Sequence, residues 1–208
     1  MCFSATASFV VGGVLTLAGA VTLKRASSSY EIPLAAMPLL FGIQQMIEGV
    51  LWLSFQYEAA QLKTLTTYMY TIFSHILWPI YVPIAIALIE QNSWRRRLLW
   101  GLSAVGIITG GVLGELIATH PLNAVLNEHL VYVVMDHYDW PMMVAYITAT
   151  CLAPLFSSYS LIRLLGCLVF LMFIVTYWFY TVALFSVWCF FAAILSSIIY
   201  LFFRGERT

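Results

Sequence analysis

The sequence predicts an all-α fold: a polytopic membrane protein whose 208 residues form one domain, a bundle of seven transmembrane helices. Hydrophobic residues make up 62% of the chain and charged residues 9%, against about 45–50% and about 25% in soluble proteins. Seven apolar stretches approach the roughly 20 residues that a helix needs to cross the ~30 Å hydrocarbon core of a bilayer. These predicted spans cover residues 5–23, 34–56, 65–89, 97–118, 141–158, 162–180 and 183–203.

The charged residues exclude one class of function and orient the chain. Nine basic residues balance nine acidic ones and no basic run exceeds three residues, which argues against nucleic-acid binding. If the spans alternate in direction, eight of the nine basic residues fall on one face, which the positive-inside rule makes cytoplasmic. We therefore expect a multi-pass protein of the cell membrane with its N-terminus outside and its C-terminus inside. The eight residues are Lys24, Arg25, Arg95, Arg96, Arg97, Arg163, Arg204 and Arg207.

The segment between the fourth and fifth predicted spans is more polar than its neighbours. Residues 121–138 carry apolar side chains at helical spacing, and Pro121 suits a first helical turn. We expect an amphipathic helix that lies along the outer membrane interface. His129 and Asp136 would then fall on its inner stripe.

Two ionisable residues lie well inside predicted spans, where a charge costs ~2.5–3.5 kcal/mol and indicates a functional site. In the second span, Gln44, Glu48 and Trp52 recur every four residues and form one stripe, with Gln45 beside it. The third span carries His75. Both Glu48 and His75 lie roughly 12–15 Å below the outer ends of their helices, so we expect them to meet as a buried pair.

Pro79 strengthens the case for a site at His75. A proline removes the amide that would bond the carbonyl four residues earlier, which here belongs to His75. A free carbonyl beside an imidazole at a helix kink would suit a ligand or an ion. The alternative is an ordinary kink in which water or Ser74 satisfies that carbonyl. Trp78 lies in the same turn.

Further residues are expected at the same outer level, around a pocket that faces the periplasm or exterior. Two of them have a plainer alternative: Glu115 would be solvated at the interface, and Cys189 would be a small packing residue. A row of glycines in the fourth span is interpreted as a helix-packing surface. The pocket residues are Glu115, Tyr177, Ser186 and Cys189, and the glycines are Gly106, Gly110 and Gly114.

The N-terminus offers two further candidates, Cys2 and Ser4. With the N-terminus outside, both would lie at the pocket mouth, where Cys2 could act as a nucleophile or metal ligand. The alternative is structural, with Ser4 or Ser8 capping the first helix.

Histidines and acids from several segments could form a mixed nitrogen and oxygen metal site. Three such ligands and a water are the pattern of catalytic zinc, or of another divalent transition metal, which activates the water. No local HExxH signature is present, and the alternative for the loop histidines is a solvated surface. The candidate ligands are Glu48, His75, His129, Asp136 and His137, with His120 as a further possibility.

Four motifs carry a resemblance: MCFSATASF, PLLFGIQQMIEGVLW, LWPIYVP and SVWCFFAA. Together they resemble, nearly end to end, a bacterial membrane-protein family catalogued as domain of unknown function 6629. The resemblance implies no particular activity. A looser similarity is to seven-span zinc hydrolases such as the alkaline ceramidases, although their HxxxH pair is missing from the last span here. The family motifs draw attention to Cys2, Ser4, Gln45, Glu48, Trp52, Trp78, Pro79, Trp188 and Cys189.

Three functional hypotheses follow. The first is a metal-dependent membrane hydrolase of a lipid or amphipathic substrate, with Glu48 as ligand or general base and His75 as ligand. The second is a small transporter, an ion- or proton-binding protein or a sensor that uses the Glu48–His75 pair. The third is a haem or other redox protein, in which His75 would need a loop histidine as its partner.

Overall fold

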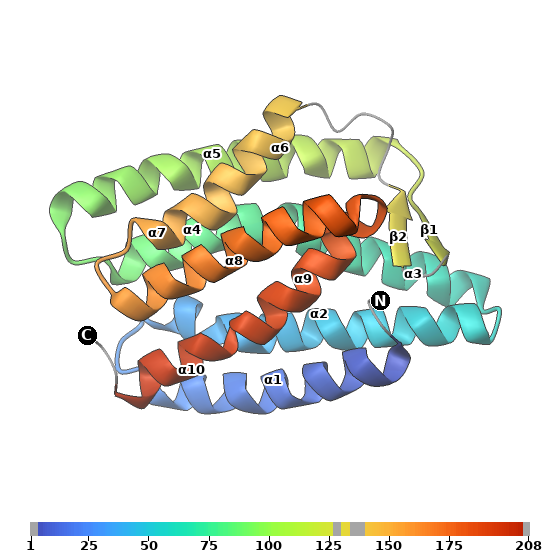
Figure 1. Cartoon of the computed structure of the whole chain (residues 1–208), viewed down its shortest axis with the longest axis horizontal. Helices are drawn as coiled ribbons and strands as arrows, with labels where there is room; N and C mark the ends of the chain where they lie inside the picture. Colours follow the sequence, from blue (N-terminus) through green and yellow to red (C-terminus); the bar gives the residue numbers. More distant parts are fainter. Residues whose placement is uncertain (1–3, 127–129, 134–139, 206–208) are drawn as a thin grey trace.

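The computed structural model describes residues 4–126, 130–133 and 140–205. Most of the helices run lengthwise through the bundle, and a small β-hairpin lies at one end (Figure 1). Within these described residues, six helical stretches are long and apolar enough to cross a membrane, and a shorter apolar helix covers Trp140–Leu155. The six are Ala5–Arg25, Ile32–Gln56, Ala60–Ile89, Ser93–Thr119, Ser160–Phe179 and Thr181–Arg204.

Several of these stretches are interrupted by other helix types. Two π-helical segments, η1 and η2, precede prolines, Pro79 and Pro154, which cannot donate a backbone hydrogen bond. The fifth predicted span, 141–158, is thus a broken helix that begins one residue earlier and ends near Leu155. The elements are α1 (Ala5–Arg25), α2 (Ile32–Gln56), α3 (Ala60–Thr71), η1 (Ile72–Leu77), α4 (Trp78–Ile89), α5 (Ser93–Thr119), β1 (Asn123–Leu126), β2 (Leu130–Val133), α6 (Trp140–Ile147), η2 (Thr148–Leu152), α7 (Ala153–Leu155), α8 (Ser160–Phe179), η3 (Thr181–Ala183), α9 (Leu184–Leu195) and α10 (Ser197–Arg204).

The outer surface of the helices is apolar, as a lipid bilayer requires. Leu17 is 72% exposed and Ile108 66% exposed, each near the middle of its helix. Exposed apolar surface of this kind would be a liability in water but matches hydrocarbon. The protein therefore fits a multi-pass membrane protein.

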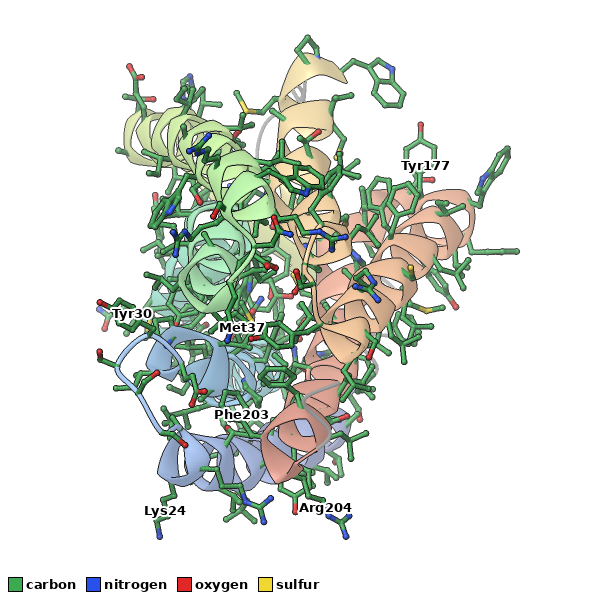
Figure 2. The ribbon with its side chains drawn as sticks, turned by 90° about the vertical axis from the view of Figure 1, so that its left-hand side faces the viewer. Lys24, Tyr30, Met37, Tyr177, Phe203 and Arg204 are labelled. Atoms are coloured by element: carbon green, nitrogen blue, oxygen red, sulfur yellow. The ribbon has the colours of Figure 1, made fainter. Side chains whose placement is uncertain are left out.

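The basic helix ends gather at one end of the bundle. The last turn of α1 carries Lys24 and Arg25, and the last turn of α10 carries Arg204. In Figure 1 these ends lie at the same end of the bundle as the starts of α5 and α8. Viewed from that end, Lys24 and Arg204 point away from the helices (Figure 2). The end of the bundle that holds these residues is called the basic end below, and the opposite end the hairpin end.

The outer segment differs from its prediction. An interfacial helix over 121–138 is wrong for the described residues, because Asn123–Leu126 and Leu130–Val133 pair as antiparallel strands. The burial alternates, as in a strand with one face on a core: Ala124 and Leu130 are buried, while Val125 is 42% exposed. The buried face packs on Leu51 at the hairpin end of α2. His129 and Asp136 lie outside the described residues.

The glycine row of α5 is a packing surface, as predicted. A Cβ atom built on Gly106 would lie 1.9 Å from the backbone oxygen of Pro79, and one on Gly110 2.8 Å from Ile80. Gly114 faces Ile76 in the same way, at 3.3 Å. These glycines let α5 approach η1 and α4 closely, and this contact fixes the segment that carries His75.

Candidate functional site

A group of buried polar side chains lies between α2, η1 and α9. Each of its members is at most 4% exposed, although buried polar groups are costly in an apolar interior unless they are hydrogen-bonded. We call this group the buried polar cluster, and it consists of Gln44, Glu48, Ser74, His75, Ser186 and Cys189.

Glu48 joins α2 to α9. The hydroxyl of Ser186 donates a hydrogen bond of 2.8 Å to Oε1 of Glu48. One turn further along α9, the thiol of Cys189 lies beside the side chains of Gln44, Glu48 and Tyr70. The sequence places Glu48 and Ser186 far apart, so only the packing of α2 against α9 brings this pair together.

His75 lies within η1, and its ring is fully buried. Its Nδ1 lies 2.6 Å from Oγ of Ser74, and the imidazole packs against Phe185 with the ring centroids 4.4 Å apart. Phe185 directly precedes Ser186, the partner of Glu48. Glu48 and His75 therefore contact consecutive residues of α9, and this places them at one level of the bundle.

Pro79 predicts a simple kink in the helix. The structure instead has a π-helical segment, η1, at His75. A π-bulge rotates the side chains that follow it, and such bulges are frequent at functional sites. The carbonyl of Ser74, beside the predicted carbonyl of His75, accepts a hydrogen bond from the hydroxyl of Tyr146. Tyr146 is fully buried in α6 and was not among the predicted site residues. Its only sequence signal is a phenol in an otherwise apolar helix.

Trp78 and Gln44 form the side of the cluster that lies nearer the basic end. The indole nitrogen Nε1 of Trp78 donates a hydrogen bond of 2.7 Å to Oε1 of Gln44. The indole also stacks on Phe41, with centroids 3.8 Å apart. This bond fixes the orientation of the Gln44 amide, whose oxygen must face the indole.

Below the cluster lies an apolar cavity of about 60 Å³. Trp78, Cys189 and the indole of Trp188 line it on the cluster side, and Ile162 and Ile199 line it farther in. Small-molecule sites usually enclose about 300–1,000 Å³. The cavity is therefore too small to hold a lipid substrate in this conformation.

Some predicted pocket residues lie outside the cluster. Glu115 is exposed on α5. Tyr177 is 37% exposed and packs against Trp140, with ring centroids 6.4 Å apart. Trp188 is buried, and its indole donates to the carbonyl of Val169.

The predicted metal site has no support from the described part of the chain. His129, Asp136 and His137 lie outside the described residues. Among the described residues, no three His, Cys, Asp or Glu side chains are grouped closely enough to hold a metal ion. His120 hydrogen-bonds to Thr119 at the end of α5. Zinc or another divalent metal at Glu48 and His75 stays a prediction.

Ser4 has a structural role at the start of α1, and a catalytic role for it stays a prediction. It is the N-cap of α1, and its Oγ accepts a hydrogen bond of 3.2 Å from the amide of Ala7. Cys2 lies outside the described residues. We expect Ser4→Ala to lower the free energy of unfolding by about 1 kcal/mol, and Ser4→Asp to retain it, because aspartate also caps helices. Reversible unfolding in mixed detergent micelles measures both, and equal losses in the two variants would contradict the capping role.

The family of the chain is decided by a match over its whole length. Family of unknown function (DUF6629) matches residues 1–208. The chain belongs to this family. No curated protein and no solved structure matches the chain, so the similarity to alkaline ceramidases is not shown.

Proposed function

We propose that the protein is a single-domain, seven-span membrane protein that binds a proton or a small cation at Glu48. In this proposal Trp140–Leu155 is the seventh span, the basic end faces the cytoplasm, and the N-terminus and the hairpin face outward. The alternation of the helices and the basic residues at one end support this orientation. Glu48 then lies in the outer half of the bilayer.

The observation that carries the proposal is the complete burial of Glu48 in the middle of α2. Its side chain is 0% exposed, and the hydroxyl of Ser186 donates a hydrogen bond to its Oε1. An ionised carboxylate in an apolar interior is costly; a bound proton removes its charge, and a bound cation compensates it. His75 lies at the same level of α9, through its contact with Phe185, and supplies a second group that can exchange a proton.

Infrared difference spectroscopy of the purified protein at two pH values tests the proposal. We expect a carboxylic acid signal that disappears in Glu48→Gln and persists in the matched control Glu115→Gln, whose carboxylate is exposed. Glu48→Gln keeps an oxygen that can accept from Ser186, so the variant should fold. His75→Gln should keep the signal and shift the pH at which it appears, since it removes a neighbouring titratable group.

Cation binding is tested on the same four samples: the wild type and the three variants. Unfolding in the presence of sodium, potassium or zinc ions at constant ionic strength should stabilise the wild type if a cation binds, by about 2.7 kcal/mol at a hundred times the dissociation constant. Stoichiometric zinc, lost in both Glu48→Gln and His75→Gln, would instead favour the metal-dependent hydrolase. Identical behaviour of Glu48→Gln and Glu115→Gln in all measurements would overturn the proposal.

A further inference from the structure

Three buried polar groups beside Glu48 have unmet hydrogen-bonding capacity. Gln45 and Ser8 are both 0% exposed. Among the described residues, neither side-chain atom of Gln45 has a hydrogen-bond partner, and the same holds for Oγ of Ser8 and for the buried Nε1 of Trp52. Because both Gln45 atoms lack partners, the result does not depend on which way the amide is turned.

These groups lie along one line between α1 and α2. Gln45, Glu48 and Trp52 share one flank of α2, since they are three, four and seven residues apart. Ser8 belongs to the buried face of α1. The helices pack antiparallel, with Phe9 against Gly49 and Gly12 against Gly42 and Met46, so Ser8 lies near the level of Gly49, between Trp52 and Gln45. Figure 1 shows α1 and α2 side by side over their lengths.

The line opens at the hairpin end. A recess of about 390 Å³ lies there, lined by Ser4, Thr6, Trp52 and Gln56 among others. From Trp52 to Glu48 the rise along α2 is only about 6 Å, a distance that two or three hydrogen-bonded waters cover. Buried waters typically satisfy polar groups of this kind with two to four hydrogen bonds each.

The line is closed towards the basic end. A Cβ on Gly12 would lie 3.0 Å from the backbone oxygen of Gly42, and one on Gly42 would lie 2.8 Å from the amide of Thr16. The backbones of α1 and α2 thus touch directly below Gln45 and leave no room for water. Below this contact, a Cβ on Gly19 would overlap the backbone of Leu39, so the two helices stay in close contact towards the basic end.

We propose that water enters from the hairpin end past Trp52 and Ser8 and delivers protons to Glu48, from that side only. Gln45, one turn farther from the opening, holds the water next to the carboxyl. The inference rests on the proposed function and names its ligand as the proton. The groups along the line favour this ligand over a metal ion: the indole N–H of Trp52 only donates, whereas cations require oxygen ligands throughout. One-sided access fits a protein that responds to outside pH, and a conducting pathway would need a second opening.

Hydrogen–deuterium exchange of the Glu48 carboxyl, followed by time-resolved infrared spectroscopy, tests the route. We expect Gln45→Leu to slow the exchange about tenfold or more, because leucine has a similar size and no hydrogen-bonding group. Trp52→Phe is the mildest change and should slow it less. The matched control is Thr16→Val on the closed side of the Gly12–Gly42 contact, which should leave the rate unchanged.

The outcomes separate the route from the proposed function. If the wild-type signal is present and Gln45→Leu, Trp52→Phe and Thr16→Val all exchange at the wild-type rate, the route is wrong and the proton site stands. If the wild type gives no titrating Glu48 signal, the route fails together with proton binding at Glu48, and the cation measurements alone decide the proposed function. In right-side-out vesicles, a pH jump outside should protonate Glu48 far faster than a jump inside, and equal rates would overturn one-sided access.

Discussion

Replacing Gly106 with alanine is expected to destabilise the protein by about 3 kcal/mol, the upper part of the range for overpacking a close contact. The new methyl group would lie 1.9 Å from the backbone oxygen of Pro79. A backbone atom cannot rotate away as a side chain can, so α5 must move from α4. The measurement is reversible unfolding in mixed micelles.

Two glycines of the same helix provide matched controls. A Cβ on Gly101 or on Gly111 would have no heavy atom within 4 Å. Alanine at either position should leave stability unchanged or raise it by up to about 1 kcal/mol, because alanine favours the helix over glycine. If Gly106→Ala unfolds like Gly111→Ala, the close approach of α5 and α4 does not exist in the membrane protein.

Gly106→Ala should also change the infrared signal of Glu48. Pro79 follows the π-helical segment that holds His75, so a displaced α5 releases the segment that fixes the imidazole. We expect the infrared signal of Glu48 in Gly106→Ala to broaden, since its surroundings would no longer be unique. Gly111→Ala should keep the wild-type spectrum.

The sequence was sufficient for features that depend on long runs or local spacing. A run of about 20 apolar residues predicts a span whatever its neighbours are, and the described part of the chain has six such helices. The spacing of Gly106, Gly110 and Gly114 predicts a contact surface because residues four apart share a helix face. The burial of Glu48 follows equally from its place within an apolar run.

The remaining features depend on which helices meet in space. Ser186 is the partner of Glu48 only because α9 packs on α2, and no local pattern indicates that neighbour. The hairpin was predicted to be a helix because apolar residues are so frequent after Leu122 that they fit both the helical and the strand period. Tertiary packing favours strands, because a hairpin places Ala124 and Leu130 together against Leu51.

At the basic end, Glu90 is expected to hold two connections of the bundle together. It follows α4, is 2% exposed, and accepts hydrogen bonds from the amide of Ser158 at 2.7 Å, from its hydroxyl at 2.6 Å and from the amide of Asn92 at 2.9 Å. The carbonyl of Ser157 in turn accepts from the guanidinium groups of Arg95 at 2.8 Å and of Arg163 at 3.0 Å. The segment between α7 and α8 is thus fixed by charged groups on both sides.

We expect Glu90→Gln to lower the free energy of unfolding at neutral pH by about 2–4 kcal/mol. Hydrogen bonds to a charged acceptor contribute roughly 1.5–3 kcal/mol each and are not additive. Glutamine offers one accepting oxygen, and its NH₂ group would face a donor at Ser158 or Asn92. Glu115→Gln, at an exposed carboxylate, should change stability by less than about 0.5 kcal/mol.

The pH dependence distinguishes this role from a packing defect. Burial by itself raises the pKa of Glu90, but the hydrogen bonds from Ser158 and Asn92 and the charge of Arg95 outweigh it and lower the pKa below its ordinary value of 4.5. A carboxyl whose pKa is lower in the folded state stabilises the protein above pH 4.5 and loses this contribution as the pH falls through the folded-state pKa. The stability difference between wild type and Glu90→Gln should therefore shrink steadily below pH 4.5. A difference that stays constant with pH would mean that the substitution only disturbs packing, and that the charge of Glu90 does not hold the two connections.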